Sequence, residues 1–252
     1  MFDVSGRLAL VTGSSRGLGR SLAFALAEAG ATVVVHGRDA AGAAETADAI
    51  EAASGIRPPV ALFDVTDAGA VERGVAAVVA EHGVPDILVN NAGVQRRAPF
   101  SEFGIEDWDA VVTTNLSSVF YVSRFVTPDM VRRGSGKIVN IASVQSKLAR
   151  QTIAPYSASK GGVAQLSRGM AADLARHNIQ VNTISPGYFA TEMNRALVED
   201  REFTEWVERR TPAGRWGVVE ELRGTLIYLC SAASDFVSGQ NIFVDGGMTS
   251  VV

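Results

Sequence analysis

The stretch TGSSRGLG, residues 12–19, decides the fold expected for this chain. It follows a short apolar run from Arg7 to Val11 and precedes a helical pattern that continues to Ala29. A strand, a tight glycine turn and a helix in this order let the backbone approach a pyrophosphate whose charge lies at the helix N-terminus. The spacing is G-x-x-x-G-x-G and differs from the common G-x-G-x-x-G motif. The prediction of a dinucleotide site therefore rests on the position of this stretch between a strand and a helix.

Strand-like and helix-like patterns alternate along the rest of the chain. Apolar or β-branched runs predict further strands at 32–35, 60–63, 87–89, 137–142, 180–184 and 241–244, with helical patterns before the later ones. This alternation predicts an α/β fold with a Rossmann-type doubly wound parallel sheet of about seven strands and helices on both faces. Because no linker or change of composition divides residues 1–252, we expect a single domain for dinucleotide binding and catalysis.

Two longer segments stand apart from this alternation. A helical pattern from Trp108 to Met130 is apolar on most of its circumference, which favours a subunit contact. Pro128 is expected to kink this helix or to end its regular part. After Pro186 a long segment shows little strand character, and loops of that length in compact domains are usually lids. We therefore expect a substrate lid at about 187–215.

Composition and charge exclude several classes of protein. The 252 residues are 47% hydrophobic and carry a formal net charge of −4, which gives no general attraction to nucleic acid. The N-terminus lacks a signal-peptide pattern and no apolar run reaches membrane-spanning length, so we expect a cytoplasmic protein without a membrane partner. The single Cys230 excludes an internal disulfide, and the scattered histidines lack metal-ligand spacing, so no metal is expected.

The segment HGRD, residues 36–39, ends the second predicted strand and bears on the choice of cofactor. An acidic side chain here would accept hydrogen bonds from a free ribose 2′-hydroxyl, whereas a basic one accommodates a 2′-phosphate. Arg38 lies just beyond the strand and Arg16 projects from the glycine turn, so we expect NADP in preference to NAD. Asp39 leaves an alternative open, because it could cap the next helix or accept the hydroxyl after all.

A second group of residues suggests acid–base chemistry. Tyr156 and Lys160 lie four residues apart in a helical pattern that begins near Pro155, so their side chains share one face. A tyrosine has an ordinary pKa of about 10, and an adjacent cation can lower it by roughly 1–3. Ser143 follows the fifth predicted strand and is therefore expected at the ligand-binding edge of the sheet. Asn115 is a lone amide in an apolar helix, where a structural role and a role in the site are both open.

The chain resembles the classical short-chain dehydrogenase/reductase family over nearly its whole length. The motifs that carry this resemblance are TGxxxGxG at 12–19, NNAG at 90–93 and PG at 186–187, together with the residues of a catalytic tetrad. The resemblance implies that Tyr156 is the general acid and base of a hydride transfer and that Ser143 binds the carbonyl oxygen. It also implies that Lys160 lowers the pKa of Tyr156 and binds the nicotinamide ribose, and that Asn115 holds a water.

The motifs and the resemblance together imply an NADP site. Asp64 ends the third predicted strand, where contact with the adenine ring and capping of the next helix are both open. The expected cofactor-binding residues are Gly13, Ser15, Arg16, Gly17, Leu18, Gly19, His36, Arg38, Asp64, Val65, Asn91, Ala92, Gly93, Tyr156, Lys160, Pro186, Gly187 and Thr191.

Segments around the expected substrate pocket resemble one branch of this family, the gluconate 5-dehydrogenases, also called 5-keto-D-gluconate 5-reductases. These segments are NNAGVQRRAPF from 90, KIVNIASVQSKLAR from 137, APYSASKG from 154, PGYFATEM from 186 and TPAGRWG from 211. The resemblance implies NADP-dependent interconversion of D-gluconate and 5-keto-D-gluconate by a homotetramer, with a dimer as the alternative. Other activities left open are 2-deoxygluconate 3-dehydrogenation, 3-oxoacyl thioester reduction and non-catalytic dinucleotide sensing.

An anionic, hydroxylated substrate agrees with the polar residues expected around this pocket. Arg96 and Arg97 follow the fourth predicted strand, and a guanidinium group pairs well with a carboxylate. Of these two we favour Arg97, and Arg150 can add a further contact. The expected substrate-binding residues are Gln95, Arg97, Gln145, Arg150 and Tyr188.

Overall fold

The computed structural model describes residues 1–251, except for the side chain of Met193. Seven parallel strands form one sheet in the order β3-β2-β1-β4-β5-β6-β7. The strands are β1 Leu8–Val11, β2 Thr32–Gly37, β3 Val60–Leu62, β4 Ile87–Asn90, β5 Gly136–Ile141, β6 Ile179–Pro186 and β7 Asn241–Val244. The expected doubly wound parallel sheet is confirmed, and each strand end lies within two residues of its expected position.

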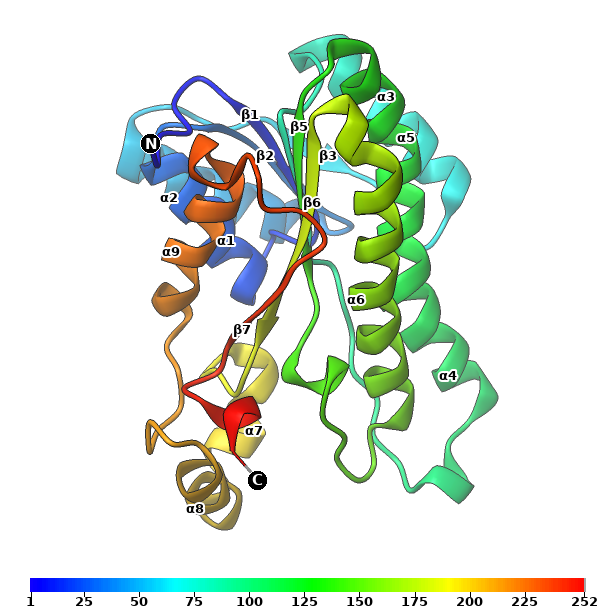
Figure 1. The fold of residues 1–252 in the computed structure, drawn as a ribbon, viewed down its shortest axis with the longest axis vertical. Coiled ribbons are helices and arrows are strands. Elements are labelled where there is room, and N and C mark those ends of the chain that lie inside the picture. The colour runs from blue at the N-terminus through cyan, green and yellow to red at the C-terminus, as the bar shows by residue number, and fades with distance from the viewer. Residues whose placement is uncertain (252) are drawn as a thin grey trace.

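Helices cover both faces of the sheet, as the strand and helix alternation predicts (Figure 1). The helices are α1 Gly17–Glu28, α2 Ala40–Ser54, α3 Ala68–His82, α4 Ile105–Val112, α5 Ser118–Arg133, α6 Ala154–Leu174, α7 Arg195–Val198, α8 Arg201–Arg210 and α9 Arg223–Cys230. In Figure 1, α1, α2 and α9 lie on one side of the sheet and α3 to α6 on the other. The short helices α7 and α8 lie beyond the carboxyl end of β6.

The direction in which the chain crosses the sheet reverses next to β1. From β1 the chain winds outward through β2 to β3, and it then returns to β4, which pairs with the other edge of β1. In open parallel sheets ligands bind outside the carboxyl ends of the strands at such a reversal. The topology therefore places a binding site beyond the ends of β1 and β4, where residues 12–19 and 90–93 lie.

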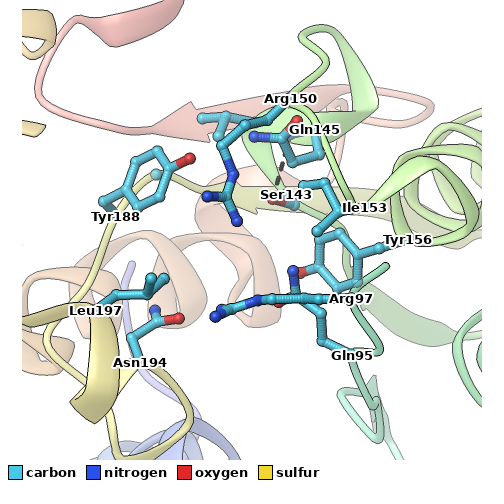
Figure 2. A pocket seen from close by; sticks show the side chains of 12 residues that line it. Gln95, Arg97, Ser143, Gln145, Arg150, Ile153, Tyr156, Tyr188, Asn194 and Leu197 are labelled. Carbon is cyan, nitrogen blue, oxygen red and sulfur yellow. Dashed lines mark hydrogen bonds between the residues drawn. The ribbon is translucent and has the colours of Figure 1, made fainter. Parts of the chain in front are cut away.

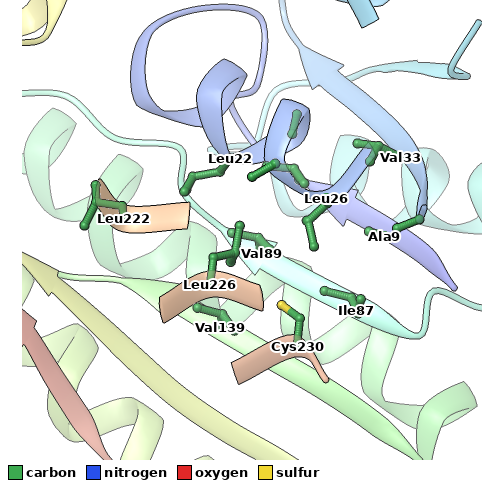
Figure 3. Close-up of a cluster of buried hydrophobic side chains, with 14 of the residues drawn as sticks. Ala9, Leu22, Leu26, Val33, Ile87, Val89, Val139, Leu222, Leu226 and Cys230 are labelled. Atoms are coloured by element: carbon green, nitrogen blue, oxygen red, sulfur yellow. The ribbon is translucent and has the colours of Figure 1, made fainter. Parts of the chain in front are cut away.

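Apolar packing fixes the sheet between the two helix layers. On the first face, Leu22 and Leu26 of α1 and Leu226 of α9 pack over the central strands (Figure 3). Cys230 lies in the same cluster, and burial raises the pKa of its thiol to about 12. This agrees with a cysteine that acts as a small apolar side chain. A second cluster joins α3, α5 and α6 to the opposite face.

Two aspartates cap helices that follow strands. Asp39 accepts hydrogen bonds from the backbone N–H groups of residues 41 and 42 at the start of α2, and Asp67 does the same for residues 69 and 70 at the start of α3. Such caps satisfy backbone donors that have no partner inside the helix. Of the two roles left open for Asp39, the structure shows the cap.

The apolar helical segment around Asn115 differs from expectation. Instead of one helix from Trp108 to Met130, α4 begins at Ile105, a π-helical turn occupies Thr113–Ser117, and α5 follows. Of the two effects expected of Pro128, a kink or an end to the regular helix, the second is wrong, because α5 continues to Arg133. Packing of α5 against α3 and α6 outweighs the local cost of the proline. The irregular turn contains Asn115 instead.

None of the helices within residues 1–251 combines the length and apolar character needed to cross a membrane.

Candidate active site

The glycine turn between β1 and α1 depends on its lack of side chains. Gly13 and Gly17 have positive φ angles of 64° and 56°, a backbone conformation that favours glycine. A Cβ atom on Gly13 would lie 2.9 Å from the Cα atom of Ala92, and one on Gly19 would collide with the Gly13 carbonyl and the Asn91 amide. The turn therefore packs closely against the segment after β4, and at Gly17 it leaves a backbone cradle open at the start of α1, which suits a pyrophosphate.

The NNAG segment after β4 holds this turn in place. The Thr12 hydroxyl accepts hydrogen bonds from the backbone N–H groups of Asn91 at 3.0 Å and Ala92 at 3.2 Å. In return, Nδ2 of Asn91 donates to the carbonyl oxygens of Thr12 and Gly13. The two motifs at the reversal of the sheet are thus joined into one rigid unit.

His36 lies beneath the glycine turn and is only 2% exposed. Its Nδ1 accepts a hydrogen bond from the Gly13 N–H at 3.0 Å, and its Nε2 lies 3.1 Å from the carbonyl oxygen of Phe63, to which it donates in the neutral tautomer. Burial lowers the pKa of His36 to about 4. Both ring nitrogens are bound to backbone groups, so His36 can influence a cofactor only by positioning Gly13.

The two arginines expected near a 2′-phosphate project from neighbouring backbone. A Cβ atom on Gly37 would lie 3.1 Å from the Cβ of Ser15, so the end of β2 and the glycine turn are in contact. Arg38 donates to Asp64 at 3.3 Å in an exposed ion pair, and the same carboxylate accepts from the N–H and hydroxyl of Thr66. Asp64 is therefore bound to protein groups at the edge of the site.

The remaining residues expected at the cofactor occupy different surroundings. Leu18 and Val65 pack into the two apolar clusters, and Thr191 precedes a short helical turn in the segment after β6. Gly187 lines the cavity described below, and a Cβ atom there would lie 2.8 Å from the Cα atom of Asp245.

Ser143, Tyr156 and Lys160 come together beyond the end of β5. Ser143 lies two residues after the end of β5, and its hydroxyl oxygen accepts the backbone N–H of Gln145 at 3.2 Å. Tyr156 and Lys160 lie in the first two turns of α6, with Pro155 at the tolerated first-turn position. The Lys160 ammonium donates to the carbonyl oxygen of Ile141 at 2.7 Å and lies 5.7 Å from the centre of the Tyr156 ring.

Asn115 connects three parts of the site. Its Oδ1 accepts the backbone N–H of Val94 at 2.8 Å, and its Nδ2 donates to the Val94 carbonyl at 3.0 Å and to the Ser159 hydroxyl at 3.2 Å. A Cβ atom on Gly93 would lie 3.3 Å from Asn115 Oδ1 and 3.8 Å from the Lys160 ammonium. Asn115 is therefore fixed beside the candidate catalytic lysine, and the π-helical turn places it there.

Burial changes the proton affinity of both α6 residues. Desolvation raises the pKa of Tyr156, and the hydrogen bond with Ser143 opposes this only in part. The direction is opposite to the lowering expected from the nearby lysine, because in this structure the desolvation of the phenol outweighs the favourable contacts of its charged form. Burial lowers the pKa of Lys160 to about 8.

A cavity of about 60 Å³ opens beside Ser143 and Tyr156 (Figure 2). Tyr188, Asn194 and Leu197 lie across it from these two residues. All five residues expected to bind substrate line it. The full lining is Gln95, Arg97, Ser143, Val144, Gln145, Arg150, Ile153, Tyr156, Gly187, Tyr188, Asn194 and Leu197.

The cavity carries two positive charges without matching carboxylates. Arg97 and Arg150 extend toward it, and neither forms an ion pair with a carboxylate within residues 1–251. Partial burial and the charge of Arg150 both lower the pKa of Arg97, so the two guanidinium groups repel each other. Arg96 is different, because its side chain pairs with Asp107 at 3.4 Å and does not line the cavity.

The segment after β6 contributes an aromatic cluster behind the cavity. Tyr188 makes edge contacts with Phe203, Trp206 and Trp216, with ring centres 5.6–5.7 Å apart. The guanidinium of Arg150 lies 5.0 Å from the centre of the Phe203 ring, which joins the loop after β5 to α8. Across the residues described here, three or more histidine, cysteine, aspartate or glutamate side chains never gather as a metal site would need.

The fold, the glycine cradle and the Ser143–Tyr156–Lys160 arrangement define a class of protein. The chain belongs to the short-chain dehydrogenase/reductase family, and a family model described as enoyl-(acyl carrier protein) reductase matches residues 13–249.

Particular relatives within this family are close to the chain. It is 55% identical to the gluconate 5-dehydrogenase of Gluconobacter oxydans (strain 621H), over 99% of this chain and 97% of the relative. It is 48% identical to the 5-keto-D-gluconate 5-reductase of Escherichia coli (strain K12), over 100% of this chain and 99% of the relative. A gluconate 5-dehydrogenase from Burkholderia cenocepacia J2315, crystallised with NADP and tartrate, superposes with a TM-score of 0.97 and 53% identity, over 100% of this chain and 98% of the other.

Proposed function

We propose that this chain catalyses the NADP-dependent interconversion of D-gluconate and 5-keto-D-gluconate, with Tyr156 as the general acid and base. The two curated relatives carry these activities in their names and share 55% and 48% of their residues with the chain. The Burkholderia relative binds NADP together with tartrate, a hydroxylated dicarboxylate.

One observation supports the sugar-acid substrate most directly. Arg97 and Arg150 extend into a cavity that also exposes Ser143 and Tyr156, and they have no carboxylate partner in the described chain. Two guanidinium groups at the same cavity are a favourable site for one carboxylate, which would relieve their mutual repulsion. The carboxylate of gluconate supplies that charge at the end of the molecule away from its C5 atom.

The backbone cradle fits NADP. Gly13 and Gly19 let the glycine turn pack closely against residues 91 and 92, and Gly17 borders open space at the start of α1, where a pyrophosphate would lie. Arg16 and Arg38 extend from touching backbone segments and provide two guanidinium groups for a 2′-phosphate. Asp39 caps α2 with both carboxylate oxygens, which gives this acid a structural role that does not depend on a 2′-hydroxyl. These features support NADP in preference to NAD.

When bound, NADPH supplies the hydride that reduces the ketone carbon. Tyr156 gives its proton to the developing alkoxide, and Ser143 donates a hydrogen bond to the same oxygen. Burial raises the pKa of Tyr156, which keeps the phenol protonated and suits it to the reducing direction. Lys160 places a positive charge near the phenolate that remains, and Asn115 holds a water beside Lys160 for return of the proton.

We also propose two features of the whole molecule. Residues 187–215 act as a lid over the substrate, since they carry Tyr188, Asn194 and Leu197 to the cavity. The enzyme is cytoplasmic. It is a homotetramer, because α4 and α5 leave the apolar side chains of Trp108 and Phe120 42% and 51% exposed on the surface. Size-exclusion chromatography with light scattering tests the assembly, and a monomer at micromolar concentration would contradict it.

A panel of ketones tests the function. NADPH and NADH oxidation should be followed with 5-keto-D-gluconate, 3-keto-2-deoxygluconate and a 3-oxoacyl thioester. We expect the highest kcat/KM with 5-keto-D-gluconate and NADPH. If only the thioester reacts, the sugar-acid function is wrong, and if no ketone reacts with either cofactor, a non-catalytic dinucleotide sensor is the better description.

A further inference from the structure

Gln145 occupies a fixed position next to the reacting groups. It lies two residues after Ser143, in a short helical turn, and its backbone N–H donates to the Ser143 hydroxyl oxygen at 3.2 Å. This bond links the Gln145 backbone to the hydroxyl that is proposed to hold the reacting oxygen. Any substrate group that meets the Gln145 side chain therefore lies close to the reacting carbon.

The carboxamide of Gln145 has no hydrogen-bond partner among residues 1–251 as the structure describes them. The residue is only 8% exposed, and its Oε1 is buried without a hydrogen bond within the described chain. Its Nε2 makes no hydrogen bond to the described residues either. Buried amides in native proteins are nearly always satisfied, so an orphan in the wall of a cavity needs an explanation. Because the side chain lines the cavity beside Ser143, a bound ligand is the available partner (Figure 2).

The chemistry of the orphan differs from that of its neighbours. Arg97 and Arg150 present donors and positive charge, which suit a carboxylate. A carboxamide is neutral and carries both a donor and an acceptor, and either orientation of the amide matches a hydroxyl, which can also do both. The cavity therefore has a site for an anion and a separate site for a neutral hydroxyl next to the reacting carbon.

We propose that Gln145 is a specificity-determining residue that hydrogen-bonds a substrate hydroxyl on a carbon adjacent to the reacting carbonyl. The chain then prefers α-hydroxy ketones in reduction and vicinal diols in oxidation. This inference rests on the proposed function, because 5-keto-D-gluconate carries a hydroxyl on both carbons that flank its ketone. A site built around a hydroxyl discriminates strongly against an analogue that lacks it, since the polar group of the protein is then left unpaired.

The test compares two ketones that share the carboxylate and the C5 carbonyl. 5-Keto-D-gluconate has hydroxyls beside the carbonyl, and 5-oxohexanoate has none. We expect wild-type enzyme to prefer the first by at least about 100-fold in kcat/KM. Gln145→Met keeps the length of the side chain without its polar groups, and it should reduce this preference at least about tenfold by slowing 5-keto-D-gluconate alone. Where 5-oxohexanoate turns over too slowly, D-gluconate and hexanoate are compared as competitive inhibitors.

Two further variants separate specificity from damage to the fold. Gln145→Glu retains an oxygen acceptor at the same reach and should keep the preference for the hydroxylated ketone. Gln151→Met, at an exposed glutamine in the following loop, should leave both substrates unchanged. An equal loss for both ketones in Gln145→Met, or no loss for either, overturns the inference. If wild-type enzyme does not reduce 5-keto-D-gluconate at all, the proposed function fails first and the inference fails with it.

Discussion

Around the glycine turn, polar side chains form hydrogen bonds with the protein's own backbone, whereas around the substrate cavity several polar side chains of the described chain lack a hydrogen-bond or ion-pair partner. Thr12, His36 and Asn91 all bond to backbone groups of the turn or of the strands beside it. Among the residues that the structure describes, Gln145 and Arg150 each leave a buried polar atom without a partner, and Arg97 forms no ion pair with a carboxylate. The cofactor side is therefore preorganised, while the substrate side holds groups that a ligand must satisfy.

The largest loss of activity should come from a substitution of Tyr156, which lies between the cofactor side and the substrate side of the site. Tyr156→Phe removes the proton donor, and we expect kcat with 5-keto-D-gluconate to fall by about 10²–10⁴-fold, the usual contribution of a general acid. NADPH should bind within about threefold of the wild-type affinity, because the glycine cradle is unchanged. Steady-state kinetics and fluorescence titration with NADPH measure the two quantities. Residual turnover within tenfold of wild type would remove Tyr156 from the mechanism.

Low pH should destabilise the cofactor side of the protein through protonation of His36. His36 has a folded-state pKa of about 4 against 6.5 in the unfolded chain, so the folded protein binds fewer protons between these values. Stability is full above pH 6.5 and is lost as the pH falls toward 4, by up to about 3 kcal/mol from this residue. Urea unfolding at a series of pH values measures this loss.

His36→Gln provides the control for that measurement. Its carboxamide can accept from the Gly13 N–H and donate to the Phe63 carbonyl without titrating. The difference in unfolding free energy between wild type and variant should therefore shrink or reverse between pH 6.5 and 4 in favour of the variant. Parallel pH curves for the two proteins would show that His36 does not titrate in this range. Asp64, which favours the charged form of His36, should be kept intact in both.

The substrate cavity can be tested by removing one of its two guanidinium groups that lack an ion pair in the described chain, that of Arg97 or that of Arg150. Arg97→Met and Arg150→Met should each raise KM for 5-keto-D-gluconate by about 10–100-fold, the value of one charged hydrogen bond, with little change in NADPH affinity. Arg96→Met is a matched control, because Arg96 pairs with Asp107 outside the cavity and its loss should have almost no effect. If Arg96 matters more than Arg97, the carboxylate lies elsewhere.

The smallest change in cofactor affinity should come from the exposed ion pair between Arg38 and Asp64. Asp64→Asn weakens the hold on Arg38 and leaves that guanidinium freer for a 2′-phosphate. Exposed ion pairs contribute about 0–1 kcal/mol, so NADPH affinity should rise by only about two- to fivefold, and NADH affinity should not change. Isothermal titration with both cofactors measures this. A loss of NADPH affinity would mean that Asp64 itself supports the cofactor.

Local sequence signals predicted the glycine turn and its position between β1 and α1. Glycines at 13, 17 and 19 mark backbone that tolerates no side chain or adopts positive φ, and this requirement is visible in the residues themselves. The role of His36 could not be predicted, because its partners Gly13 and Phe63 are distant in sequence and their backbone groups leave no trace in residue type. The raised pKa of Tyr156 also depends on burial that spacing alone does not reveal.

The substrate half was harder to predict for geometric reasons. Arg96 and Arg97 are neighbours, and where consecutive side chains point to opposite sides the pattern alone does not indicate which one faces the site. Arg97, favoured for its position, is the one that lines the cavity. Asn194 and Leu197 reach the cavity from the segment after β6, and nothing in their types marks them. The π-helical turn around Asn115 adds a single residue to a helical period, which a pattern averaged over several turns does not resolve.

The buried position of Cys230 has a practical consequence for observing the proposed lid. The sequence contains no other cysteine, and this thiol is enclosed in the core with a pKa of about 12. A maleimide dye reacts with an accessible thiolate, so the native surface offers it no target. A single Glu202→Cys substitution on the exposed side of α8 would then carry the only fluorescent label, and its emission would report movement of residues 187–215 when NADPH and substrate bind.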